Sequence, residues 1–441
     1  MAWRRYPKSY TDGQPLRRKM WPYLGLLVLT LGLVWVGYTT DRIPGTRVSS
    51  TVIAPVATSK PGQLLGIEQT REYNEVEATA LVHQNYANAP TANHVPVTKV
   101  VFRYQSQDVD GKYITVYGRA YIPDSSKPLP LFAFAPGTTG IGDQCAPSLE
   151  DPAKANWANY DSHMMMYAEQ GYATVTTDYE GMRDPSRMHH YMVGELEGRA
   201  LLDAVRAVRQ LPKAKGKLDD TVFLGGYSQG GHAAFWADKI NTQYAPDITL
   251  TGVVGFGPVM SVRQTLTDVT HGANINWFGP YVLTSYTDYY QTDYHPEDIL
   301  LPTRLENLKT SVEAHCIDTD LAYWGKTPAG VYTPEFIAAM ATNNLTGPYQ
   351  AFGDAMDKNA VGDLVTATPK LINEGALDNV VLPAQQKNIL PGLCKSSKGA
   401  VQFKLYPKAT HYDTMKYSLA DTLNWMSTLR SGGSVPTTCN T

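Results

Sequence analysis

Residues 221–234 read TVFLGGYSQGGHAA, and this stretch decides the fold. It begins with β-branched and apolar residues typical of a buried strand, and it continues into a run that fits a helix. Between the two, residues 226–230 match the G-x-S-x-G nucleophile elbow in the strand–turn–helix setting that this motif requires. A serine on so sharp a turn needs neighbours without large side chains, and Gly226 and Gly230 flank it. The helix would direct its N–H groups and positive dipole at an oxyanion forming above Ser228.

Strands and helices alternate on both sides of this elbow. The alternation predicts an α/β fold with a mostly parallel sheet that is covered on both faces. The segments around Asp110-Gly111 are expected to form a hairpin, because that dipeptide is a turn signal. Apolar residues at the helical period predict helices over 195–211 and 417–429. Besides the elbow strand, apolar or β-branched runs predict strands at 100–104, 113–117, 129–135, 172–177, 248–256, 369–373 and 401–406.

The alternation stops between residues 257 and 365, where aromatic residues are dense. Because this region interrupts the core, we expect it to form a mainly helical cap over the site. Its aromatic residues fit the cap's own core as well as a substrate surface, so no individual contact is assigned.

The expected organisation is a basic tail at 1–20, a membrane segment at 21–38, a linker with N-terminal decoration at 39–97, a core at 98–256 and 366–441, and the cap at 257–365.

The N-terminal region predicts export. Residues 1–19 are rich in Arg and Lys, and the uncharged segment 21–38 is rich in Leu and Val. As a helix that segment would span about 27 Å, close to the hydrocarbon thickness of a bilayer. The positive flank would remain in the cytoplasm and place the rest of the chain outside. A cleaved signal peptide is the alternative, but no A-x-A-like site follows closely, which favours an uncleaved signal anchor.

Composition narrows the function classes. The formal net charge of −3 gives no reason to expect nucleic acid as a partner. None of the cysteines has C-x-x-C spacing, which argues against zinc and thioredoxin-type sites, and we expect no metal and no organic cofactor. In an exported protein an even number of cysteines fits two disulfides. The four cysteines are Cys145, Cys316, Cys394 and Cys439.

A nucleophilic serine needs a base to take its proton and a carboxylate to orient that base. With this elbow the chain order should be serine, acid, histidine. Four histidines follow the elbow helix, and only His411 comes directly after the last predicted strand; the others are His271, His295 and His315.

Asp378 is the preferred acid, because it lies just past the strand at 369–373 on a turn after Gly375. Glu374 is too close to the end of that strand, and Asp363 lies before it. Asp178 and Glu180 end an earlier strand and are expected to hold loops by hydrogen bonds.

Acyl transfer also needs hydrogen-bond donors for the oxyanion, each contributing about 3–4 kcal/mol in the transition state. One should be the backbone N–H of Gln229, the residue after the nucleophile. The other should come from the loop after the strand at 129–135, with Gly137, Thr138 and Gly140 as candidates. Which amide of that loop points inward stays open.

Together these motifs resemble the secretory lipase family of α/β-hydrolases, of the yeast lipase A type. The resemblance covers about residues 98–430 and rests on Gly137-Thr138, the segment DQCAPS at 143–148, the elbow at 226–231, Gly375-x-x-Asp378 and His411.

The resemblance implies a Ser228–Asp378–His411 triad, a helical cap between the sixth and seventh strands, and hydrolysis of lipid esters. It also implies the disulfides Cys145–Cys316 and Cys394–Cys439. Some family members have an acidic residue at the position of Gly140 that assists the oxyanion, and glycine here offers no such side chain.

The expected protein is therefore an exported, membrane-anchored serine carboxylic ester hydrolase, foremost a triacylglycerol lipase, with a lipid or ester substrate. A short-chain esterase, an acyltransferase or a peptidase on the same triad remains an alternative. A non-catalytic surface protein with this fold is a third.

Overall fold

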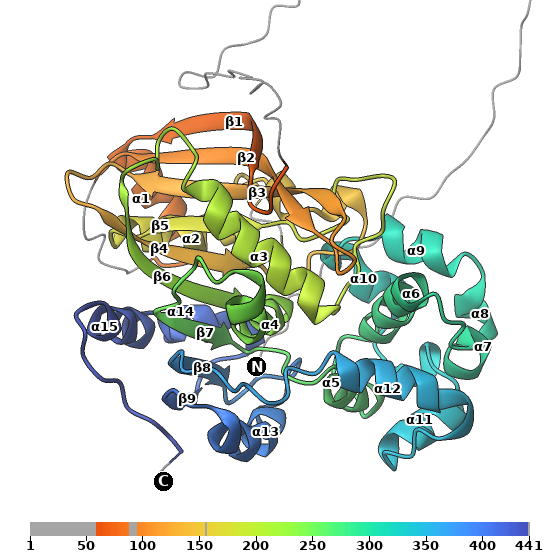
Figure 1. Ribbon diagram of the computed structural model, residues 1–441. Coiled ribbons are helices and arrows are strands. Elements are labelled where there is room, and N and C mark those ends of the chain that lie inside the picture. The colour runs from red at the N-terminus through yellow and green to blue at the C-terminus, as the bar shows by residue number, and fades with distance from the viewer. Residues whose placement is uncertain (1–58, 88–94, 155–156, 440–441) are drawn as a thin grey trace, which may run out of the picture. The chain divides into compact units, whose positions relative to one another are not determined.

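In the computed structural model, nine β-strands of the described chain form one sheet (Figure 1). They are β1 (Leu64–Tyr73), β2 (Val97–Gln107), β3 (Tyr113–Pro123), β4 (Leu129–Ala135), β5 (Ala173–Thr177), β6 (Leu218–Tyr227), β7 (Gly252–Phe256), β8 (Lys370–Gly375) and β9 (Val401–Tyr406). Their spatial order is β1-β2-β3-β5-β4-β6-β7-β8-β9. The three pairs from β1 to β5 are antiparallel and all the others are parallel, which confirms the mostly parallel sheet.

The structure describes residues 59–87, 95–154 and 157–439. The expected basic tail and the membrane segment at 21–38 lie outside these ranges. Within the ranges, no helix combines the length and the apolar character that crossing a bilayer requires.

The central strands are buried on both of their faces. Every residue of β4, β5, β7 and β8 is buried. Parallel strands between two helical layers show this continuous apolar pattern, because neither face meets water. The apolar runs of the sequence thus become the middle of the sheet, and β6 carries the nucleophile elbow at its end.

Helices cover both faces of this sheet. On one face pack α3 (Gly194–Val208), α4 (Gln229–Tyr244) and α13 (Pro383–Ser396). On the other face pack α1 (Glu75–His83), α2 (Tyr160–Glu169), α14 (Thr414–Tyr417) and α15 (Leu419–Arg430). The predicted helical period in α3 is confirmed, since Leu201, Leu202, Val205 and Val208 are all buried against the sheet.

Only helices and short turns connect β7 to β8. The helices are α5 (Val262–Thr270), α6 (Phe278–Tyr290), α7 (Pro296–Ile299), α8 (Pro302–Leu305), α9 (Leu308–Ala314), α10 (Ile317–Trp324), α11 (Pro334–Ala341) and α12 (Gln350–Lys358). Figure 1 shows them grouped beside one end of the sheet and not over either face. We call α5–α12 the cap. The cap has an aromatic core of its own, with Tyr281, Tyr286, Trp324, Tyr332 and Phe352 fully buried.

The sheet begins earlier than the sequence suggested. A weak helical pattern around Glu68–Val82 led us to expect linker and decoration before residue 98, but β1 occupies 64–73 and pairs with β2. β1 is the edge strand and only three of its ten residues are buried, so it lacks the apolar pattern of a buried strand. Counting β1, the cap lies between the seventh and eighth strands of the chain and not between the sixth and seventh.

Two disulfides join distant parts of the chain. Cys145 in the loop after β4 is bonded to Cys316 at the start of α10, and Cys394 in α13 is bonded to Cys439 near the C-terminus. These are the pairs that the family resemblance implies. The first one ties the core loop that follows β4 to the cap.

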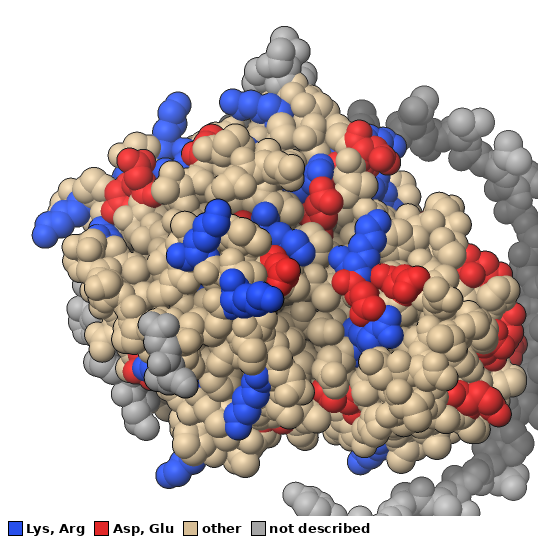
Figure 2. Space-filling model, turned by 60° about the horizontal axis from the view of Figure 1, so that its bottom comes forward, with Lys and Arg blue, Asp and Glu red and all other residues tan. Residues whose placement is uncertain are grey.

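Charged side chains of both signs are mixed on the surface. Figure 2 shows lysine and arginine interspersed with aspartate and glutamate over one face of the described chain. This distribution agrees with the small formal net charge of −3.

A buried histidine also ties the core to the cap. His190, in the core loop before α3, lies with Nδ1 2.7 Å from Glu180 Oε1 and with Nε2 3.0 Å from Asp288 Oδ2 of α6. Burial disfavours the imidazolium, but the two carboxylates outweigh this effect and raise the pKa of His190 above its ordinary value. Arg187 and Lys309 are the basic neighbours of the same carboxylates.

This tie predicts a stability that depends on pH. The pKa of His190 is higher in the folded chain than in the unfolded chain, where it is about 6.5. Its contribution to the free energy of unfolding is therefore complete below about pH 6.5 and is lost as the pH rises through the pKa of the folded chain. We expect His190→Gln to lower the free energy of unfolding by about 2 kcal/mol at pH 6, most of it from the buried Glu180 contact. Urea unfolding at pH 6 and pH 9 should show the difference from wild type shrinking at the higher pH. An equal difference at both values would contradict the assignment.

Candidate active site

Ser228 lies between the end of β6 and the first turn of α4, with φ +56° and ψ −117°. Positive φ is strained for a residue other than glycine and is found where function requires it. A Cβ on Gly226 would lie 1.8 Å from the carbonyl oxygen of Gly230, and one on Gly230 would lie 1.8 Å from that of Ala135. The elbow therefore closes only with glycine at both positions. The N–H of Ser228 donates to the carbonyl of Phe256 on β7 at 3.0 Å, which holds the turn in place.

The structure brings Asp378 and His411 together at the ends of β8 and β9. His411 Nδ1 lies 2.6 Å from Asp378 Oδ2, and both side chains are buried. The carboxylate accepts a hydrogen bond from the Nδ1–H group, so Nε2 is left as the basic nitrogen. Asp378 Oδ1 accepts the N–H groups of Val380 and Val381 at 2.8 and 2.9 Å, which fixes the carboxylate.

Electrostatics separates Asp378 from its rivals. Burial by itself would raise the pKa of Asp378, but the charge and hydrogen bond of His411 hold it below the ordinary value. Burial and the neighbouring Asp378 raise the pKa of Glu374 well above its ordinary value, so Asp378 carries the negative charge of this pair. Asp363, the other rival, is exposed on the surface before β8. Only Asp378 of the three contacts His411.

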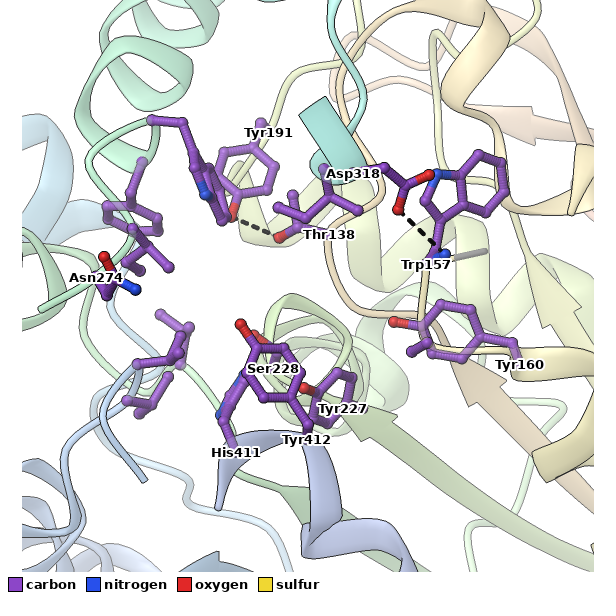
Figure 3. A pocket seen from close by; sticks show the side chains of 18 residues that line it. Thr138, Trp157, Tyr160, Tyr191, Tyr227, Ser228, Asn274, Asp318, His411 and Tyr412 are labelled. Carbon is purple, nitrogen blue, oxygen red and sulfur yellow. Dashed lines mark hydrogen bonds between the residues drawn. The ribbon is translucent and has the colours of Figure 1, made fainter. Parts of the chain in front are cut away.

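Ser228 and His411 open into one pocket of about 230 Å³. Figure 3 shows Asn274 on one side of Ser228, and Trp157, Tyr160 and Asp318 on the other. The walls are mainly apolar and aromatic, as in most small-molecule sites. The lining residues are Thr138, Trp157, Ala158, Tyr160, Tyr191, Tyr227, Ser228, Val259, Asn274, Ile275, Trp277, Phe278, Ile317, Asp318, Val380, Val381, His411 and Tyr412.

Of the three candidates in the loop after β4, only Thr138 lines the pocket. Its Oγ1 and the hydroxyl of Tyr191 are 2.8 Å apart (Figure 3). Gly137 is packed against Tyr160, since a Cβ added to Gly137 would lie 2.8 Å from the Tyr160 hydroxyl oxygen. Gly140, at φ +135°, pairs with Cys316 beside the disulfide. Within the described residues no acceptor is bonded to the backbone N–H of Thr138 or of Gln229, so these two amides stay available.

The two acids assigned to loops have that role. Asp178 Oδ1 accepts the N–H of Ser148 at 2.7 Å, and Glu180 holds His190. Sequence reasoning missed Glu197, which contacts the side chain of Gln229 from α3. No local pattern marks Glu197, because it lies within an ordinary amphipathic helix.

The arrangement has the parts that acyl transfer on a serine needs. In the described ranges, no group of three or more His, Cys, Asp or Glu side chains is placed to hold a metal ion. The pocket instead combines a strained serine, a histidine oriented by a buried carboxylate, and two free backbone amides, which are the parts of a serine nucleophile site.

Known proteins resemble this chain in sequence and in fold. Lipase A of Moesziomyces aphidis is 27% identical over 179 residues (38% of this chain and 37% of that protein). Lipase 1 of Candida albicans is 26% identical over 304 residues (63% of this chain and 60% of that protein). The matches thus span less than two thirds of these relatives.

The rice cell wall degrading esterase LipA from Xanthomonas oryzae has the same fold, with a TM-score of 0.69 and 20% identity over 85% of this chain and 99% of LipA. The α/β-hydrolase fold expected from the elbow is therefore confirmed. The family model of the secretory lipases matches residues 152–437, which is more than half of the 441-residue chain and includes the elbow, Asp378 and His411. The chain belongs to the secretory lipase family.

Proposed function

We propose that the protein is a serine carboxylic ester hydrolase that works through an acyl-enzyme on Ser228. The observation that carries the proposal is the buried His411–Asp378 hydrogen bond in the pocket that contains Ser228. His411 Nε2 takes the Oγ proton as Oγ attacks the ester carbonyl carbon, and it then returns that proton to the leaving alcohol. Water gives a proton to the same nitrogen as it attacks the acyl carbonyl carbon. The bond from this carbon to Oγ then breaks, Nε2 returns the proton to Oγ, and the carboxylic acid leaves free Ser228.

The backbone amides of Gln229 and Thr138 are the proposed oxyanion donors. Gln229 is the first residue of α4, so the positive end of the helix dipole adds to its N–H. Thr138 lies on the opposite wall of the pocket from His411 (Figure 3). Removal of one such donor in serine hydrolases costs about 2.7–4 kcal/mol in the transition state.

A triacylglycerol lipase is the foremost form of this proposal, in line with the lipase names of the family relatives. The pocket volume favours a second form, a short-chain esterase. With the cap in its present position, the pocket of about 230 Å³ is smaller than the roughly 300–1,000 Å³ typical of small-molecule sites. A short acyl group therefore suits it better than a long one.

The chain-length preference tests these two forms. With p-nitrophenyl esters from acetyl to palmitoyl, we expect kcat/KM to be highest for butyryl to octanoyl and to fall about 10-fold or more for palmitoyl in solution. Each methylene that finds no pocket forfeits about 0.8 kcal/mol of burial. Emulsified triacylglycerol is the second substrate. Its acyl chains are long, so its hydrolysis would show that the cap opens. No Ser228-dependent turnover of any ester would overturn the whole proposal.

We further propose that the body of the protein is exported, with residues 21–38 as the membrane anchor. Its two disulfides fit an oxidising compartment. Fractionation of the expressing cells, with protease added from outside, tests this location. An intact protein found only in the soluble cytosol would contradict it.

A further inference from the structure

A buried polar cluster lies directly beneath the elbow and contacts Gln229. Gln229 Nε2 donates to Glu197 Oε1 at 2.8 Å and lies 3.0 Å from His189 Nε2. Glu197 Oε1 also accepts the N–H of Met192 at 3.1 Å, and its Oε2 is 2.7 Å from His232 Nδ1. Gln229, Glu197, His189 and His232 are each at most 1% exposed. Four buried polar side chains at one point are costly to desolvate unless they are fully bonded.

Their proton positions follow from the acceptors around them. His189 Nδ1 is 2.9 Å from the carbonyl of Glu180, which only accepts, so its proton is on Nδ1. The bare Nε2 then accepts the second N–H of the Gln229 amide. Both hydrogens of the Gln229 side-chain amide therefore have an acceptor, one in Glu197 and one in His189.

The cluster continues to the cap. His232 Nε2 donates to the carbonyl of Asn359, the residue after α12, at 2.7 Å. Asn359 Nδ2 donates to the hydroxyl of Tyr290 on α6 at 2.7 Å. The residue after the nucleophile is thus linked through Glu197 and His232 to two helices of the cap.

We propose that Glu197 is a positioning residue that sets the direction of the Gln229 backbone N–H, and through it the strength of the oxyanion hole. The Ser228–Gln229 peptide belongs to a strained turn. Its carbonyl accepts the N–H groups of Gly231, His232 and Val259 at 3.0, 3.3 and 3.2 Å, which hold the peptide from the Ser228 side. The side chain of Gln229 is anchored at its far end, so its Cα and the peptide before it have little freedom. Oxyanion donors act only when they are held in place before the reaction. The inference rests on the ester hydrolase function proposed above.

Substitutions of the side chains test this role, because they leave the backbone N–H in place. The variants are Gln229→Leu, which removes the anchored amide, Glu197→Met, which removes the acceptor, and Glu197→Gln, which keeps one acceptor oxygen for Gln229. Asp203→Asn is the matched control. Asp203 is also a fully buried acid of α3 with three side-chain partners, Ser106, Tyr244 and Arg206, but it lies away from the elbow.

The measurements are kcat and KM for a butyryl ester, the inhibition constant of a trifluoromethyl ketone that forms a tetrahedral adduct on serine, and the melting temperature. We expect Gln229→Leu and Glu197→Met to lower kcat by about 10- to 100-fold with KM within twofold, and to weaken the ketone by the same factor. Glu197→Gln should recover most of this loss. Asp203→Asn should lower the melting temperature without the fall in kcat.

Two outcomes overturn the inference. In the first, folded Gln229→Leu and Glu197→Met keep kcat and ketone affinity within twofold of wild type. In the second, Asp203→Asn loses as much kcat as they do, which would make the effect one of stability. Wild-type turnover that does not depend on Ser228 would remove the proposed function and this inference together, and that control is measured first.

Discussion

Replacing Ser228 with alanine should lower kcat for ester hydrolysis by about 10⁴- to 10⁶-fold. The change removes the Oγ that attacks the carbonyl, and the elbow at 226–230 contains no other serine, threonine or cysteine. The fold should remain intact, because Ser228 Oγ makes no hydrogen bond in the described structure and the turn is held by main-chain bonds to Phe256 and Val259. Hydrolysis of a butyryl ester, measured beside a thermal melt, checks both parts of the result.

A fluorophosphonate probe gives an independent readout of the same residue. It should label wild type on Ser228 and leave the alanine variant unlabelled, with the label located by mass spectrometry. Labelled wild type without ester turnover would favour an acyltransferase or a peptidase on the same residues. An alanine variant that still hydrolyses the ester would show that Ser228 is not the nucleophile.

Asp378→Asn should lower kcat by about 10³- to 10⁴-fold while the fold is retained. An asparagine amide donates to His411 Nδ1, so the proton of the neutral ring moves to Nε2. That nitrogen can then no longer take the proton of Ser228. The asparagine oxygen can still accept from Val380 and Val381, which keeps the turn in place.

Glu374→Gln is the matched control for this prediction. Glu374 is buried on the same strand end, and its raised pKa makes it the neutral partner of the pair. Exchanging one neutral side chain for another of the same shape should change kcat by less than about 10-fold, since no charge at His411 is lost. A loss as large as that of Asp378→Asn would make Glu374 the orienting acid. The two kcat values, measured side by side at the same pH, decide the matter.

Much of the site was readable from the sequence because its geometry is local. The elbow needs a serine between two glycines after an apolar strand. An added Cβ on Gly226 would meet Gly230 of the same turn, and one on Gly230 would meet Ala135 of the neighbouring strand β4, each at 1.8 Å. Asp378 and His411 each follow a strand by a few residues, and the ends of parallel strands meet at one edge of the sheet. The main-chain path alone therefore brings these residues together.

Other features depend on contacts between distant segments, and no local pattern marks those. β1 was missed because an edge strand has solvent on one side and shows no apolar run. Thr138 could not be separated from Gly137 and Gly140, because that choice depends on Tyr160 and on the disulfide to Cys316.

The sequence by itself determined the α/β class, the candidate nucleophile, the order of the proposed triad and the helical insertion before β8, because strand burial and the elbow impose their residue types along short stretches. Only the tertiary structure decided the size of the pocket, the choice of Thr138 as the proposed second oxyanion donor and the buried contact of Glu197 with Gln229. Glu197 and Gln229 are 32 residues apart, and His232 and Asn359 are 127 apart. Such residues come into contact only when the helices that carry them pack together, and that packing depends on the whole three-dimensional arrangement.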